Sequence, residues 1–156
     1  MITILKNYSI QDIKASIQLQ LERAAHSEEV RRHAIQITEG QQDKIVAIYN
    51  WVREHVRYVS DPVDIELFVS PVRLIKDYFK GDFISGDCDD HAILVTALYR
   101  SIGILSHVVL VESGENGLDH AFSTVWSDKL NCWLDIDTTT DHPLGWVYPN
   151  HNRIQV

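Results

Sequence analysis

The stretch that most constrains this fold is a run of apolar residues directly after a cysteine. The pattern predicts a helix over Cys88–Ile102, polar only in its first turn and around Thr96 and Arg100. A helix that is apolar on most sides has no face suited to solvent, so it must be covered all round. We therefore expect this helix at the centre of the fold, with Gly103 ending it.

Four further helices are predicted upstream, where apolar residues recur at spacings of three and four. Their ranges are Ser9–His26, Ser27 to about Gly40, Asp43–Val56 and Pro71–Phe79. Serine and aspartate suit the capping position at a helix start, and proline suits the first helical turn.

Downstream of the central helix the apolar period changes to two, which predicts strands. We expect strands over 105–112, 119–126 and 131–137, a turn over 113–118, and a loop-like tail from Thr138. Links this short favour an antiparallel meander. The predicted fold class is α+β: N-terminal helices and a central helix opened by the cysteine, packed on an antiparallel β-sheet.

The length of 156 residues predicts one domain over 1–156, with a helical N-terminal extension over 1–40 and a core over 41–148. The net charge of −8 argues against nucleic acid or an anionic membrane surface as a partner. Neither a signal-peptide pattern nor a membrane-spanning run of about 20 apolar residues is present. With two cysteines, we expect free thiols and a cytoplasmic location, although a phage particle would leave no mark in the sequence.

Cys88 is the candidate nucleophile. The first N–H groups of a helix are unpaired and partly positive, so they favour a thiolate and can hold an oxyanion. Asp87, Asp89 and Asp90 oppose this effect, because negative neighbours raise the pKa of a thiol. A nearby histidinium would then be needed to favour the thiolate.

His120, on a predicted strand, is the best candidate for that base. Asp135 and Asp137 share one face of the next strand, and either could orient the imidazole ring. His91, one turn after the cysteine, competes as a base but is expected to point to a helix flank. Cys132 is expected to be a small buried hydrophobic residue.

A metal site is the chemical rival for these residues. The potential ligands are Cys88, the histidines His91, His107 and His120, and the aspartates Asp87, Asp89 and Asp90. The sequence has neither a Cys-x-x-Cys nor a His-Glu-x-x-His pattern, and the aspartates lack the alternating spacing of a calcium loop. We expect no metal.

Several segments in order resemble the transglutaminase-like superfamily, the branch of papain-like cysteine enzymes found in many bacterial and phage proteins. The resemblance runs from about Asp43 to Gly145. Its pieces are Trp51-Val52 with Tyr58, Ser70-Pro71, Gly86-Asp87-Cys88-Asp89-Asp90-His91-Ala92, Leu98 to Ile104, His120-Ala121-Phe122, and Trp133 followed by Asp137-Thr138-Thr139.

The resemblance implies acyl transfer at an amide or peptide bond through a thioester, without a cofactor. Cys88, His120 and Asp137 fill the catalytic positions, since the family's acid stands four residues after the strand tryptophan. Thr138 departs from the usual proline or small residue. The Cys88 N–H would be one oxyanion donor, and the second donor is unassigned.

The implied partner is a protein, a peptide or another amide substrate. Small bacterial members favour hydrolysis, as in a protease or amidase, over cross-linking. The alternative is a catalytically silent module that keeps the fold for binding. Neither the substrate nor the oligomeric state is indicated by the sequence.

Overall fold

The computed structural model describes residues 1–112, 118–148 and 152–156. Within these residues the chain forms helices and strands in the following order: β1 (Ile2–Leu5), α1 (Ile10–Ala25), α2 (Glu28–Thr38), α3 (Lys44–His55), β2 (Val56–Tyr58), β3 (Glu66–Val69), α4 (Pro71–Phe79), β4 (Ile84–Gly86), α5 (Cys88–Ser101), β5 (Ser106–Glu112), β6 (Leu118–Ser127), β7 (Cys132–Ile136) and β8 (Asn152–Gln155). The predicted α+β class is confirmed.

All five predicted helices form, and local capping explains where they begin. Ser9 caps α1 in a capping box, in which its hydroxyl accepts from the Asp12 N–H and the Asp12 carboxylate accepts from the Ser9 N–H. Ser27 caps α2, and Asp43 accepts two N–H groups at the start of α3. Pro71 occupies the first turn of α4.

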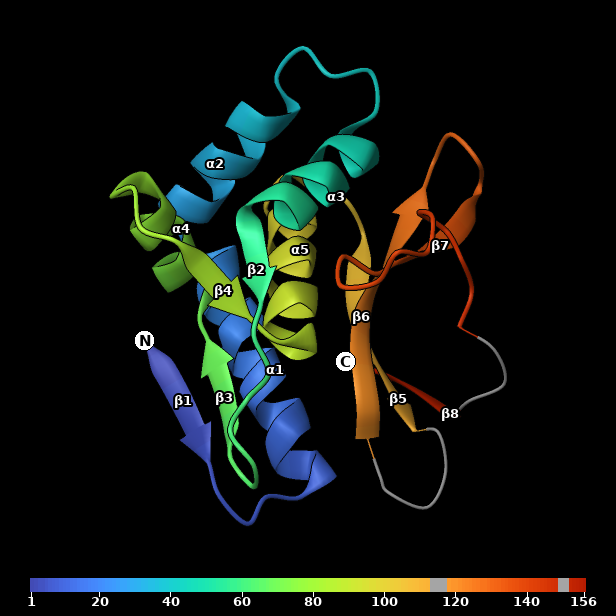
Figure 1. Ribbon diagram of the computed structural model, residues 1–156. Coiled ribbons are helices and arrows are strands. Elements are labelled where there is room, and N and C mark those ends of the chain that lie inside the picture. Colours follow the sequence, from blue (N-terminus) through green and yellow to red (C-terminus); the bar gives the residue numbers. More distant parts are fainter. Residues whose placement is uncertain (113–117, 149–151) are drawn as a thin grey trace.

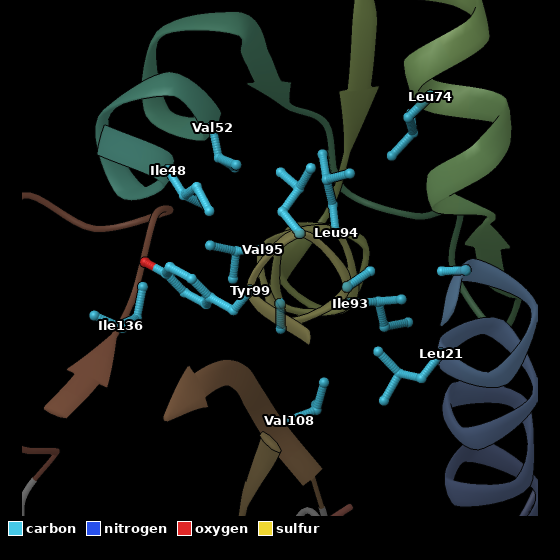
Figure 2. Close-up of a cluster of buried hydrophobic side chains, with 14 of the residues drawn as sticks. Leu21, Ile48, Val52, Leu74, Ile93, Leu94, Val95, Tyr99, Val108 and Ile136 are labelled. Atoms are coloured by element: carbon cyan, nitrogen blue, oxygen red, sulfur yellow. The ribbon is translucent and has the colours of Figure 1, made fainter. Parts of the chain in front are cut away.

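Helix α5 lies at the centre of the molecule, as predicted. Figure 1 shows α1 to α4 gathered around it, with the strands β5 to β8 on its remaining side. In Figure 2 its side chains point outward in several directions, toward α3, α4, α1 and the sheet. Ile93, Leu94, Val95, Leu98 and Tyr99 are all fully buried.

The main sheet is the predicted antiparallel meander with one additional strand. Its order is β7-β6-β5-β8, and each neighbouring pair is antiparallel. The tail was expected to be a loop, and this was wrong for β8, which pairs with the free edge of β5. A four-residue edge strand leaves little periodicity to detect. The predicted turn over 113–118 lies almost entirely outside the described residues.

The N-terminal segment differs from a purely helical extension. Strand β1 pairs antiparallel with β3, from Ile2 opposite Val69 to Leu5 opposite Glu66. Helix α1 also contributes Ile17 and Leu21 to the same buried cluster as α5. The first forty residues are therefore part of the packed structure around α5, and β1 holds the strand β3, which begins at Glu66.

Two short parallel strands lie directly before α5 and position its first residue. Strand β2 follows α3 directly and pairs with β4, so that Tyr58 lies opposite Gly86. The Val59 N–H extends this ladder by donating to the Gly86 carbonyl at 2.9 Å. Among the described residues, no helix is both long and apolar enough to cross a membrane.

Burial of α5 predicts a strong dependence of stability on its side chains. Leu94→Ala should lower the free energy of unfolding by about 2–5 kcal/mol, because it removes apolar contacts and leaves a cavity in a core that relaxes only partly. Leu130→Ala is the matched control, since Leu130 is 59% exposed. Urea unfolding followed by circular dichroism compares the two, and equal losses would contradict the central role of α5.

Candidate active site

Cys88 is the first residue of α5, directly after the turn from β4. Asp87 caps the helix, its Oδ1 accepting from the Asp89 N–H at 3.2 Å. Only glycine fits at position 86, because a Cβ there would lie 2.4 Å from the Cβ of Asp90. The glycine thus lets the chain pass close over the first turn of α5 and leaves the Cys88 side chain half-buried.

A pocket of about 460 Å³ contains both candidate reacting groups. Its lining includes Cys88 and the neighbouring Asp87 and Asp89 on one side, and His120 with Ala121 from β6 on the other. The Ala121 N–H forms a hydrogen bond with the Cys88 sulfur. The structure thus brings the cysteine and the histidine, 32 positions apart in the sequence, into one pocket.

His120 is oriented by a carboxylate at the end of β7. Its Nε2 lies 2.6 Å from the Asp137 Oδ2 and donates to it. The other oxygen of Asp137 accepts from Thr139, from the N–H at 2.9 Å and the hydroxyl at 2.7 Å. Because the carboxylate engages Nε2, Nδ1 is the ring nitrogen available for proton exchange with a thiol.

The pKa of Asp137 is lowered even though the group is largely buried. Burial favours the neutral acid, but the hydrogen bond and charge of His120, followed by the Thr139 hydrogen bonds, outweigh it. Asp137 is therefore a carboxylate at neutral pH, able to stabilise an imidazolium at His120.

Strand alternation left open whether Asp135 or Asp137 orients His120. In the structure the two aspartates have different partners. Asp135 forms a two-pronged ion pair with Arg153 of β8, at 3.0 and 2.6 Å. Asp137 alone of the two contacts His120. The family resemblance favoured Asp137, whereas strand alternation could not separate the two aspartates, because Arg153, the partner of Asp135, lies on the strand that was not predicted.

The expected opposition of Asp87 to the Cys88 thiolate is present, and burial, which was not expected, adds to it. Burial, followed by the charge of Asp87, raises the pKa of Cys88 to about 12 and outweighs the favourable hydrogen bond from Ala121. The resting sulfur is therefore a thiol. A thiolate can form only when a base removes the proton during reaction.

His91 and Cys132 do not compete for the chemical role. His91 is buried, its Nδ1 lies 2.9 Å from the Thr138 hydroxyl, and burial lowers its pKa to about 4. It is absent from the lining of the pocket. Cys132 was expected to be buried but is exposed at the start of β7.

Acidic side chains crowd the first turn of α5. Asp61, Glu66 and Asp87 form one group and Asp87, Asp89 and Asp90 another, each with ligand atoms within 4.8 Å of one another. Burial raises the pKa of Asp61 to about 6 and of Asp90 to about 8, and it also raises that of Asp89. Oxygen groups of this kind suit a hard cation, but the raised pKa values indicate that protons already neutralise part of the cluster.

Sequence reasoning missed the opposite wall of the pocket. Ile10 and Ile13 of α1 line it, together with Tyr8, which precedes the helix, and Leu118 of β6. Their spacing predicted only an ordinary amphipathic helix. Glu66 was also missed, because its place beside Asp87 depends on the pairing of β1 with β3.

A comparison with protein-family models matches residues 29–138 to the transglutaminase-like superfamily. Among solved structures, a candidate cysteine protease from Cytophaga hutchinsonii has a TM-score of 0.57 and 20% identity, covering 88% of this chain and 49% of its own. A candidate protease from Parabacteroides distasonis has a TM-score of 0.57 and 16% identity, covering 83% of this chain and 26% of its own.

At these identities the likeness to the solved structures extends to the fold alone. The chain spans about half the length of the first structure (49%) and about a quarter of the second (26%). No curated protein sequence matches the chain.

The close approach at Gly86 generates a stability prediction. Gly86→Ala should lower the free energy of unfolding by about 1–3 kcal/mol, because the added methyl must displace Asp90 or the backbone of β4. Ser85→Ala, the adjacent small residue of β4, is the control and should stay within about 0.5 kcal/mol of the wild type. Chemical denaturation measures both, and an unaffected Gly86→Ala protein would refute the steric explanation.

The acidic cluster predicts a loss of stability with rising pH. The pKa of Asp90 is about 8 in the folded chain and ordinarily 3.8, so the folded state retains a proton that the unfolded state releases. The resulting stabilisation is complete below the ordinary value and disappears as pH rises through about 8, at no more than about 1.4 kcal/mol per pH unit. Asp90→Asn retains an acceptor for the Val69 N–H and should flatten this slope between pH 5 and pH 8, measured by urea unfolding. An unchanged slope would show that Asp90 is already ionised.

Proposed function

Because the chain belongs to the transglutaminase-like superfamily, we propose that it catalyses cysteine-dependent acyl transfer at an amide or peptide bond. Cys88 is the nucleophile, His120 the general base and acid, and Asp137 the group that orients the imidazole. The observation that carries the proposal is the pocket that both Cys88 and His120 line, with His120 held by Asp137 at 2.6 Å.

The first half-reaction forms a thioester. His120 Nδ1 takes the thiol proton as the sulfur bonds to the carbonyl carbon, and the protonated imidazole then gives that proton to the leaving amine as the C–N bond breaks. Because the pKa of Cys88 is raised to about 12, proton removal accompanies attack and does not precede it. Asp137 stabilises the imidazolium formed between these two transfers.

The N-terminus of α5 supplies one donor to the oxyanion. The first N–H groups of a helix have no partner within the helix, and Cys88 is the first residue of α5. Tyr58 of β2 lines the same pocket and carries a hydroxyl that can act as the second donor. The sequence alone offered no assignment for that second position.

Hydrolysis is favoured as the second half-reaction. Water attacks the thioester, gives a proton to His120 and releases the carboxylic acid, and that proton returns to the sulfur. The candidate proteases with the same fold support this choice over cross-linking, in which a second amine would resolve the thioester.

A catalytically silent binding module is the second candidate. The observation that favours it is the raised pKa of Cys88, caused first by burial, which makes the resting thiol a weak nucleophile. The position of the sulfur on the pocket, beside the N–H of Ala121, argues for the enzyme.

Capture by a library of electrophilic amides tests the proposal. We expect covalent capture of the wild type at Cys88 and none of Cys88→Ala, read by intact-mass spectrometry. With an amide substrate found in this way, His120→Ala should abolish turnover, and Asp137→Ala should retain a remainder about 10²–10⁴-fold below the wild type. Cys132→Ser, which removes the exposed thiol, is the control and should match the wild type.

Two results would decide for the silent module. One is capture at Cys88 that is no faster than at Cys132. The other is a Cys88 reaction rate that His120→Ala leaves unchanged, since the base would then have no part in activating the thiol.

A further inference from the structure

The pocket beside Cys88 has one strongly acidic wall. Glu66, Asp87 and Asp89 all line it. These three carboxyl groups form no ion pair with a lysine, arginine or histidine among the described residues; the basic side chains that do form ion pairs bind other acids. The described lining of the pocket includes neither lysine nor arginine.

One oxygen on this wall has no partner. Asp89 is only 4% exposed, and its Oδ1 has no hydrogen-bond partner among the described residues. A buried carboxyl oxygen without a donor is costly in free energy. That oxygen is itself closed to solvent, but the Asp89 carboxyl group forms hydrogen bonds with Glu66 and Asp87, which also line the pocket. A cationic group bound at Glu66 or Asp87 therefore acts on Asp89 through these hydrogen bonds.

Helix α1 and the sheet also give the pocket apolar surface, next to the polar Asp119 and His120 of β6. Ile10 and Ile13 of α1, with Leu110 of β5 and Leu118 of β6, line the same pocket. Tyr8, just before α1, adds an aromatic ring. A ligand that fills this pocket therefore meets both aliphatic side chains and carboxyl groups.

We propose that the substrate places a lysine or arginine side chain in this pocket, next to the amide bond that Cys88 attacks. Such a side chain combines an aliphatic stem, which packs on Ile10 and Ile13, with a cationic head, which binds Glu66 and the neighbouring carboxyl groups. The inference rests on the proposed function and specifies its substrate class. An acidic substrate is disfavoured, because its carboxylates would face Glu66 and Asp87 without a compensating cation.

Three chloroacetamides that differ only in the end of a short alkyl chain test this inference. The chain ends in an ammonium, a methyl or a carboxylate group. Alkylation of Cys88 is followed by mass spectrometry at low salt in Cys132→Ser protein, and each rate is divided by the rate with glutathione to remove intrinsic reactivity. We expect the ammonium probe to react about tenfold faster than the methyl probe, and the carboxylate probe to be slowest, with the difference shrinking as salt is added.

Two variants and one control test whether the preference for the ammonium probe depends on the acidic and the aliphatic side chains of the pocket. Glu66→Gln should reduce the ammonium-to-carboxylate rate ratio at least about threefold. Ile10→Ser should slow the ammonium and methyl probes relative to unsubstituted chloroacetamide, and it keeps the inference testable if Glu66→Gln does not fold. Glu54→Gln removes an exposed acid of α3 outside the pocket and should leave all ratios unchanged.

The possible failures have different signatures. Equal rates for the three probes, with all of them slowed by His120→Ala, would overturn the substrate class while leaving the catalytic proposal intact. Rates unaffected by His120→Ala would overturn the catalytic proposal itself. Stabilisation of the wild type, but not of Glu66→Gln, by millimolar Ca²⁺ would reassign the acidic wall to a metal ion and overturn the inference.

Discussion

Enclosure of α5 is the constraint on which the rest of the structure depends. Its side chains are covered by helices on several sides and by the sheet on the remaining side. Only the ends of such a helix can reach solvent or a ligand, so a reactive group carried by it has to stand at a terminus. Cys88 stands at the N-terminus, where the free N–H groups are also the groups that an oxyanion needs.

The same enclosure has an electrostatic cost. Burial near the first turn raises the pKa of Cys88, so its thiol stays protonated, and it also raises the pKa of Asp90. His120 and Asp137 counter this cost across the pocket, because a carboxylate that stays charged can support an imidazolium. A lowered pKa of the sulfur is therefore unnecessary if the base and its carboxylate are already in position.

Strong local patterns made much of this structure predictable. The five helices and three main strands follow from apolar periods of 3.6 and 2, and the helix starts from capping residues. Strands β1 to β4 and β8 escaped prediction because segments of three or four residues carry little pattern. The pKa of Cys88 escaped for a different reason: it depends on burial and on charges brought together by the fold, whereas the sequence displays only neighbours along the chain.

The walls of the pocket have different origins along the chain. Cys88, His120 and Asp137 fall inside the segment matched to the superfamily, residues 29–138, whereas Ile10 and Ile13 precede it. The pocket is therefore assembled from the matched segment together with a helix that lies outside it. In the proposed function, the matched segment supplies the reacting groups and the acidic side chains, and the first helix adds the aliphatic surface that a ligand contacts.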